Sequence, residues 1–192
     1  MTNITIFGTG NMGTAIGAIL SGGGHSVQHV NTSTQPEAIT GEIVILAVPY
    51  AALSQIAATY GEQLAGKVVV DITNPVSFET FDDLVVAADS SAAAELAAAL
   101  PASKVLKAFN TNLGPTLAAG TVGPNKTTVL VAGDDAGAKS ALIQAITSGG
   151  KIDAVDAGSL KRARELEALG FLQIALTVAE KTTWTGGFAL VR

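Results

Sequence analysis

Cysteine is absent from this chain of 192 residues, and its absence excludes disulfide bonds, thiolate nucleophiles and thiolate metal ligands. The same absence is compatible with a cytoplasmic location, which we expect for this chain. Histidine is also scarce, because the chain has only His25 and His29. Two histidines fall short of a metal site with recognisable ligand spacing, so no bound metal is expected. We expect structural rather than catalytic roles for both.

Long apolar runs and an excess of positive charge are lacking too. Polar residues or glycines interrupt every apolar stretch before the roughly 18 to 20 residues that a membrane helix needs, so no membrane span is expected. The N-terminus begins with a strand pattern, without the basic segment and cleavage site of a signal peptide. The formal net charge of -5 argues against a nucleic acid partner, which requires a basic surface.

Strand and helix patterns alternate along the whole chain. The expected strands are short apolar runs, at residues 3–7, 26–31, 42–48, 67–71, 104–109, 127–132 and 152–155. The expected helices lie at residues 12–20, 51–60, 91–100, 136–147 and about 160–183. Alternation of this kind predicts right-handed crossovers and a mainly parallel sheet. We therefore expect a Rossmann-type, doubly wound α/β fold in one domain, residues 1–192, with a C-terminal helical extension at about 159–192 and no separate second domain.

The segment ITIFGTGNMGTAIG, residues 4–17, contains three glycines at G-x-G-x-x-G spacing between the first strand and the first helix. In this context Gly8 allows a tight turn, Gly10 lets a pyrophosphate approach the backbone, and Gly13 lets the helix pack closely on the sheet. The helix N-terminus adds free N–H groups and a partial positive charge. The alternative is that the glycines only make a tight turn. The surrounding strand and helix favour a dinucleotide.

The end of the second strand distinguishes the two nicotinamide dinucleotides. A chain that binds NAD places Asp or Glu on the ribose hydroxyls there, about 20 residues after the glycines. This sequence has Asn31, Thr32 and Ser33 at that place. A carboxylate at ~4 Å would repel a 2′-phosphate by several kcal/mol, so its absence favours NADP(H) as the cofactor. The alternative is a polar turn without a role in binding.

Three further strand ends carry polar or turn-forming residues, at residues 47–53, 71–76 and 107–112. Each segment changes from strand to turn residues where a cofactor would lie. Ligands of open α/β sheets bind beyond the carboxyl ends of the strands, so we expect these segments to face the same crevice.

The segments FGTGNMGTAIG, ILAVPY, VVDITNP, KAFNT and DAGSLKRARELEALG occur in this order and cover nearly the whole chain. With them the sequence resembles the NADP-dependent deazaflavin reductases, which are grouped with Rossmann proteins similar to pyrroline-5-carboxylate reductase. The same fold forms the cytosolic domain of metalloreductases that pass hydride from NADPH to a flavin. The resemblance implies an NADP(H)-dependent oxidoreductase whose partner is a small-molecule hydride acceptor, a flavin, a deazaflavin or a similar planar molecule.

The resemblance also implies positions for the cofactor and the acceptor. The cofactor would contact four segments: Gly8, Thr9, Gly10, Asn11, Met12 and Gly13; Asn31, Thr32 and Ser33; Ala47, Val48, Pro49 and Tyr50; and Thr73, Asn74 and Pro75. The glycine segment would hold the pyrophosphate, Thr9 and residues 31–33 the 2′-phosphate, and residues 73–75 the nicotinamide ribose. The nicotinamide and the acceptor would lie at Phe109, Asn110 and Thr111.

Residues for acid–base catalysis are not evident. A short-chain dehydrogenase needs Tyr four residues before Lys, whereas Ser54 follows Tyr50 and Leu64 follows Tyr60 at that offset. Hydroxyacid and proline-forming reductases carry a large helical second domain that the expected fold does not include. We therefore expect catalysis by orientation of two rings, with no catalytic acid or base. The alternative is a non-catalytic NADPH-binding sensor or regulatory protein.

The last predicted helix is charged in its first half and apolar in its second half. The apolar residues continue to Trp184 and Phe188 and exceed what one helix buries on its own domain. They form either core or a contact surface, in a homodimer or in a lid over the acceptor. For Arg164, a structural role and a substrate contact both stay open.

Overall fold

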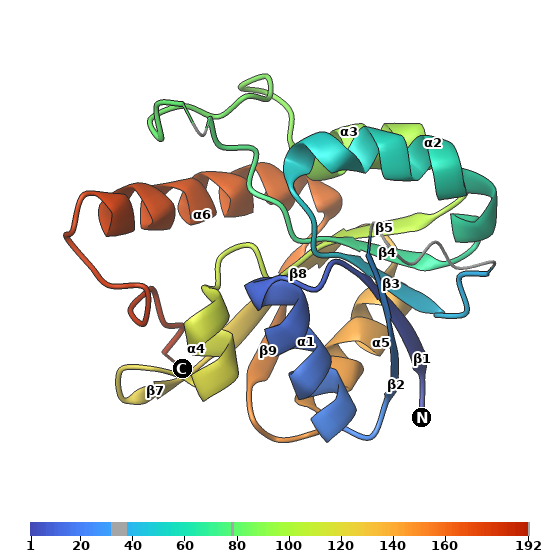
Figure 1. Cartoon of the computed structure of the whole chain (residues 1–192), viewed down its shortest axis with the longest axis horizontal. Helices are drawn as coiled ribbons and strands as arrows, with labels where there is room; N and C mark the ends of the chain where they lie inside the picture. Colours follow the sequence, from blue (N-terminus) through green and yellow to red (C-terminus); the bar gives the residue numbers. More distant parts are fainter. Residues whose placement is uncertain (32–37, 78, 192) are drawn as a thin grey trace.

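The computed structural model of the chain describes residues 1–31, 38–77 and 79–191. Within these residues a seven-stranded sheet has the spatial order β2-β1-β3-β4-β5-β8-β9 (Figure 1). Its strands are β1 (Asn3–Phe7), β2 (Ser26–Val30), β3 (Ile43–Leu46), β4 (Val68–Asp71), β5 (Lys104–Lys107), β8 (Thr128–Gly133) and β9 (Asp153–Gly158). A separate hairpin consists of β6 (Thr121–Val122) and β7 (Asn125–Lys126). The Rossmann-type α/β fold expected from the sequence is confirmed.

Helices cover both faces of the sheet (Figure 1). They are α1 (Asn11–Gly22), α2 (Leu53–Leu64), α3 (Ala92–Ala99), α4 (Gly114–Ala119), α5 (Ala136–Thr147) and α6 (Ala163–Val178), with 3-10 turns η1 (Tyr50–Ala52) before α2 and η2 (Leu160–Arg162) before α6. One face packs against α1 and α5, and the other packs against α2 and α3. Alternate residues of a strand point to opposite faces. In β3, Ile43 and Ile45 therefore belong to the first core, and Val44 and Leu46 belong to the second.

The sheet is mainly parallel, as expected, but its last two strands run in the opposite direction to the first five. Strands β1 to β5 are parallel, as the alternating pattern predicted, but β8 is antiparallel to β5 and β9 is parallel to β8. The connection between β5 and β8 explains the difference. Residues 108–127 contain α4 and the β6–β7 hairpin, which the sequence patterns did not predict, instead of a helix that returns the chain along the sheet. The chain therefore enters β8 at the edge where β5 ends.

Local signals predicted some helix ends and not others. Ser91 caps α3, because its hydroxyl accepts a hydrogen bond of 3.0 Å from the Ala94 N–H. Helix α6 is shorter than expected, because it ends at Val178 rather than near residue 183. Glu180 has a φ of 57° there, a left-handed conformation that ends a helix. The chain continues to residue 191 without a further helix or strand.

The turn between β1 and α1 explains two of the three motif glycines. Gly8 has a φ of 106°, and a Cβ atom there would lie 2.1 Å from the carbonyl oxygen of Ala47. A Cβ atom on Gly13 would lie 2.4 Å from the carbonyl oxygen of Gly8. Both positions require glycine, because real Cβ atoms do not approach backbone so closely. At Gly10, by contrast, a Cβ atom would meet no atom of the described residues within 4 Å.

Gly13→Ala and Gly10→Ala are therefore expected to differ in their effect on folding. The added methyl group at position 13 collides with the Gly8 backbone and should lower the free energy of unfolding by about 1–3 kcal/mol. At position 10 the methyl group meets no neighbour, so only helix capping weakens, by less than about 1 kcal/mol. Urea unfolding of both variants measures the difference. Equal losses would contradict the close packing of the turn.

Candidate functional site

A cavity of about 470 Å³ opens at the carboxyl ends of β1, β2 and β3. Its lining comes from the glycine turn, the strand ends and α2: Phe7, Gly8, Thr9, Gly10, Val30, Asn31, Ala47, Val48, Pro49, Ala52, Gln55, Ile56, Thr59 and Tyr60. Asn11, Met12 and Gly13 begin α1 beside it. The structure thus brings the glycine turn, Asn31 and residues 47–49 together around one cavity.

Sequence reasoning missed the wall that α2 supplies. Gln55, Ile56, Thr59 and Tyr60 line the cavity and have the spacing of one helix face. The Tyr60 ring packs edge-on against Phe7, with the ring centroids 5.2 Å apart. The spacing was visible in the predicted helix at residues 51–60, but nothing local indicated which face of that helix would meet the glycine turn.

The N-terminus of α1 has the features of a phosphate-binding turn. Gly10 is the N-cap residue, no side chain caps the helix, and the first turn contains no acidic residue. The first N–H groups keep their capacity to bind an anion, and the helix dipole adds partial positive charge. Because the space above Gly10 is open, phosphate oxygens can approach this backbone directly. These residues fit the pyrophosphate of a dinucleotide.

The cavity wall at the end of β2 fits a ribose that carries a phosphate. Asn31 lies at this wall, and no Asp or Glu occurs among the described residues that line the cavity. Thr32 and Ser33, which follow Asn31 in the sequence, lie outside the described residues. Without a carboxylate, the wall lacks the group that typically binds the free ribose hydroxyls of NAD. It therefore fits a 2′-phosphate better than free hydroxyls.

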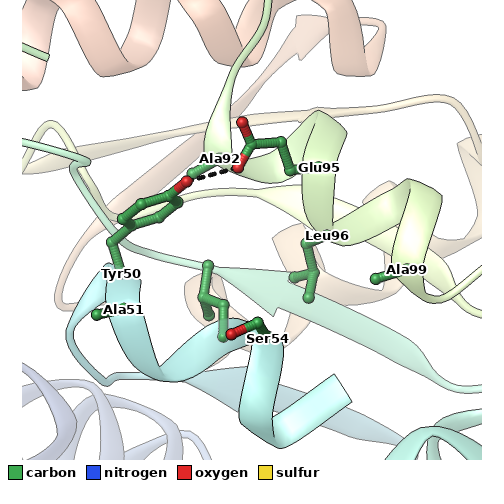
Figure 2. A pocket seen from close by; sticks show the side chains of 8 residues that line it. Tyr50, Ala51, Ser54, Ala92, Glu95, Leu96 and Ala99 are labelled. Atoms are coloured by element: carbon green, nitrogen blue, oxygen red, sulfur yellow. Dashed lines mark hydrogen bonds between the residues drawn. The ribbon is translucent and has the colours of Figure 1, made fainter. Parts of the chain in front are cut away.

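Tyr50 lies at a different pocket from Val48 and Pro49. Figure 2 shows its ring directed toward α3, where its hydroxyl donates a hydrogen bond of 2.6 Å to Glu95 Oε2. The pocket beside it has a volume of about 140 Å³ and walls from η1, α2 and α3. The hydrogen bond to Glu95, together with burial, raises the pKa of Tyr50 to about 12. Tyr50 therefore stays protonated at neutral pH and links η1 to α3.

A buried cluster of charges lies at the ends of β4 and β5. Lys107 Nζ lies 2.8 Å from Asp71 Oδ2 and 2.7 Å from Glu167 Oε1. It also donates a hydrogen bond to the backbone carbonyl of Thr73. The three charged side chains are 0% or 1% exposed. We call Asp71, Lys107 and Glu167 the buried triad.

Sequence reasoning missed the buried triad, because it treated Asp71 and Lys107 as separate strand ends and Glu167 as part of a charged helix. The available signal was a single charge within each of three apolar segments, VVVD, VLKAF and LEALG. Charged side chains are almost never fully buried unless they are paired. Each of these three charges therefore needs a partner of opposite charge. The sequence alone does not determine which residues pair.

Glu167 joins the triad to α3. Its Oε2 accepts a hydrogen bond of 3.0 Å from the Ala92 N–H, and its Oε1 accepts one of 3.3 Å from the Ala93 N–H. These N–H groups begin α3, so the carboxylate lies at the positive end of that helix dipole. Burial raises the pKa of Glu167, while the Lys107 ammonium and the Ala92 N–H oppose the rise. Glu167 thereby connects α6 with α3 and β5.

The triad holds the backbone of Thr73 from two sides. Asp71 Oδ1 accepts a hydrogen bond of 2.8 Å from the Thr73 N–H, while Lys107 donates to the Thr73 carbonyl oxygen. The Thr73 hydroxyl is buried and has no hydrogen-bond partner among the described residues. Such a group is unusual in a folded protein, because buried polar groups almost always have a hydrogen-bond partner.

Asn74 and Asn110 are paired across the ends of β4 and β5. The side-chain amide of Asn74 donates to the backbone carbonyl of Asn110 at 2.8 Å, and that of Asn110 donates to Asn74 Oδ1 at 2.9 Å. The Asn110 amide also donates to the Leu166 carbonyl at 2.8 Å, which fixes the pair under α6. A Cβ atom on Gly170 would lie 2.5 Å from Asn74 Oδ1, so α6 packs directly on this pair. Asn110 Oδ1 is buried without a partner among the described residues.

Three other residues predicted at this end of the crevice are buried: Phe109 and Thr111, expected at the acceptor, and Pro75, expected at the nicotinamide ribose. Phe109 has a φ of 63°, and its fully buried side chain belongs to the hydrophobic core. The expectation that its ring lines the acceptor site does not fit this position, because no face of the ring is open to a ligand. Thr111 lines a pocket of about 130 Å³ together with Asn112 and Phe188.

The two histidines make contacts that connect elements of the fold. His25 Nδ1 accepts a hydrogen bond of 3.2 Å from the Thr2 N–H, and His25 Nε2 lies 3.1 Å from Ser148 Oγ. His29 Nδ1 lies 3.4 Å from the Gly8 carbonyl oxygen. In the part of the chain that the structure describes, no group of three or more His, Asp or Glu side chains could hold a metal ion.

The C-terminal half of α6 and the segment after it expose large apolar side chains. Six of these side chains are between 45% and 72% exposed: Leu172, Val178, Trp184, Phe188, Leu190 and Val191. Arg164, near the start of the helix, is exposed and lies 3.3 Å from Glu165. None of the described helices has the length and apolarity needed to cross a membrane.

Comparisons with known proteins agree with this geometry. The family described as "NADP oxidoreductase coenzyme F420-dependent" matches residues 26–75. The chain is 30% identical over 171 residues to the F420-dependent NADP reductase of Methanocaldococcus jannaschii, and this match covers 88% of the chain and 76% of that protein. It is 31% identical over 185 residues to the Metalloreductase STEAP3 of Rattus norvegicus, with 86% of the chain but only 36% of that protein covered.

Solved structures share the fold. A protein from Arthrobacter sp. FB24 described as a candidate F420-dependent NADP reductase matches with a TM-score of 0.86 and 26% identity, over 100% of both chains. A pyrroline carboxylate reductase of Plasmodium falciparum with NADP bound matches with a TM-score of 0.62 and 11% identity, over 93% of this chain and 67% of that one. At that identity the second match shows the fold alone.

Tyr50→Phe tests the link between η1 and α3. Loss of the hydroxyl removes the hydrogen bond to Glu95 and should lower the free energy of unfolding by about 0.5–1 kcal/mol at pH 8. Because folding raises the pKa of Tyr50 from 10.0 to about 12, this stabilisation is present below pH 10 and is lost as the pH rises toward 12. Urea unfolding of wild type and variant should therefore show a smaller difference at pH 11 than at pH 8. A difference that does not change with pH would refute this role.

Proposed function

Because the chain belongs to the family of F420-dependent NADP reductases, we propose that it catalyses hydride transfer between NADP(H) and a flavin or deazaflavin. The observation that carries this proposal is the glycine turn. Close packing fixes Gly8 and Gly13, whereas the space above Gly10 is open to a ligand. NADP(H) is the cofactor, and the uncapped N-terminus of α1 fits its pyrophosphate.

In this proposal the cofactor lies across the carboxyl ends of the strands. The pyrophosphate binds at residues 8–13, and the 2′-phosphate binds near Thr9 and Asn31, with Thr32 and Ser33 following in the sequence. The nicotinamide half then extends away from β2, because the sheet has β3, β4 and β5 on the other side of β1. That direction leads to the ends of β4 and β5, where the Thr73 hydroxyl and the Asn74–Asn110 pair lie.

The task of the chain is to orient two rings and exclude water from the space between them. NADPH, when bound, supplies a hydride from C4 of its nicotinamide ring. Helix α6 fixes the Asn74–Asn110 pair, and the buried triad fixes the Thr73 backbone, so this end of the crevice is rigid. The Thr73 hydroxyl and Asn110 Oδ1 are buried at this end of the crevice and have hydrogen-bonding capacity that no described residue uses. No step requires a general acid or base from the protein.

A second copy of the chain is the partner favoured by the exposed apolar side chains of α6 and of the segment after it. Leu172, Trp184 and Val191 are 49%, 55% and 72% exposed in the single chain, and a homodimer would bury such side chains. Because α6 also packs on the Asn74–Asn110 pair, a homodimer contact would lie close to the acceptor site. Analytical ultracentrifugation at micromolar concentration separates this arrangement from a monomer.

Titration of cofactor fluorescence tests the binding half of the proposal. NADPH should bind at least about tenfold more tightly than NADH, because charge-assisted hydrogen bonds to the 2′-phosphate contribute about 1.5–3 kcal/mol. Gly10→Ala should weaken the binding of NADPH and of NADH by a similar factor, because its methyl group lies where the pyrophosphate approaches the backbone. Gly22→Ala, at the opposite end of α1 and equally free of neighbours within 4 Å, is the matched control.

Two results would contradict the proposal. The first is equal affinity for NADH and NADPH, and the second is unchanged affinity in Gly10→Ala. Steady-state oxidation of NADPH with flavins, deazaflavins and quinones then tests catalysis. Tight binding without oxidation by any of these acceptors would favour a non-catalytic NADPH sensor.

A further inference from the structure

The buried triad has an unbalanced charge. Lys107 contributes one positive charge, whereas Asp71 and Glu167 contribute two negative charges when both are ionised, which leaves one negative charge in excess. The hydrogen bonds fit the ionised forms, because backbone N–H groups or the Lys107 ammonium reach all four carboxylate oxygens. Solvent does not screen this excess charge, because the three side chains are buried.

The first N–H groups of α3 offset part of this charge, because Ala92 and Ala93 donate to Glu167, but no second cationic side chain joins the three described residues. The charges of Glu95, Glu167 and Asp71 all help to raise the pKa of Tyr50, which begins η1. The cationic side chain of Arg164 is at the exposed surface of α6, beside Glu165. Its charge is therefore screened by solvent and paired locally.

The triad also lies where the proposed function places the nicotinamide ring. Asp71 and Lys107 end β4 and β5, and both hydrogen-bond the backbone of Thr73. The Thr73 hydroxyl is buried without a partner among the described residues. The excess charge is thus hydrogen-bonded to the backbone of the residue whose hydroxyl lacks a partner.

We propose that the buried triad favours the oxidised, cationic nicotinamide ring over the reduced, neutral ring. This inference rests on the proposed function, because it requires NADP(H) in the crevice. Transfer of a hydride removes two electrons and one proton from C4 and leaves the ring with one positive charge. The acceptor, an oxidised flavin or deazaflavin, takes the hydride and then a proton from solvent. A fixed negative charge attracts the cationic ring and does not attract the neutral one, so NADPH becomes a better hydride donor.

The test compares the dissociation constants of NADP⁺ and NADPH at pH 8 by titration calorimetry, without an acceptor present. Glu167→Gln removes one negative charge at nearly constant size, and Asp71→Asn does the same from β4. Each variant should raise the ratio of the NADP⁺ to the NADPH dissociation constant by about fivefold to twentyfold, the order expected for a unit charge at an effective dielectric constant near 20. Glu165→Gln, the same substitution at a position that is 44% exposed on the same helix, should leave the ratio unchanged.

The outcomes separate this inference from the proposed function. If the triad variants change the affinity for both forms by the same factor, the triad is only structural and the inference is overturned. If the wild type binds neither form, the proposed function itself fails. If both triad variants fail to fold, the test is made on the wild type. The ratio of the NADP⁺ to the NADPH dissociation constant is then measured at 0.05 M and at 0.5 M salt. A buried charge keeps that ratio constant within about twofold, whereas a larger change points to exposed charges and overturns the inference.

Discussion

The ammonium group of Lys107 between two buried carboxylates is the constraint on which the rest of this structure depends. It joins β4, β5 and α6, and Glu167 extends the connection to the first N–H groups of α3. Removing one partner of a buried ion pair leaves an uncompensated charge and typically costs about 3–5 kcal/mol. These elements therefore have one arrangement in which the ammonium group and all four carboxylate oxygens have partners. That arrangement sets the backbone of Thr73 and brings α6 onto Asn74.

The two ends of the crevice use different physical means. At the glycine turn, backbone N–H groups and a helix dipole bind an anion, so the site needs no cationic side chain and is compatible with a formal net charge of -5. At the other end, a network of buried side chains fixes polar groups and carries excess charge. In the proposed function the first end supplies affinity for phosphates, and we propose that the second determines where a ring lies and which charge state it prefers. Tyr50, hydrogen-bonded to Glu95, connects the segment after β3 with α3, which also binds Glu167.

Features that depend on neighbouring residues could be predicted from the sequence. The glycine turn and the first strand and helix follow from signals a few residues apart. Features that depend on distant segments could not. The pairing of Lys107 with Glu167 and the antiparallel entry of β8 arise only when the sheet and α6 assemble. A charged residue within an apolar run indicates that an oppositely charged partner exists. It does not indicate which residue that partner is.

Side-chain direction was the other limit of sequence reasoning. Tyr50 follows Val48 and Pro49 in the chain, but it begins η1 and its ring turns toward α3. Phe109 lies two residues after the end of β5, and with its left-handed φ of 63° its ring lies in the core. In both cases the segment was placed correctly at a strand end, and one backbone turn decided which side chain faces the crevice. Such turns are set by tertiary packing rather than by local preference.

Direct hydride transfer between two rings in contact can be tested by following the transferred hydrogen from NADPH to the acceptor. NADPH that carries deuterium at the transferred C4 position can be incubated with the protein and an oxidised deazaflavin in ordinary water. Direct transfer predicts reduced deazaflavin with the deuterium on C5, because a carbon-bound hydrogen passed between the rings does not exchange with solvent. Deuterium recovered in water, or no reduction of the deazaflavin by a protein that binds NADPH, would contradict this mechanism.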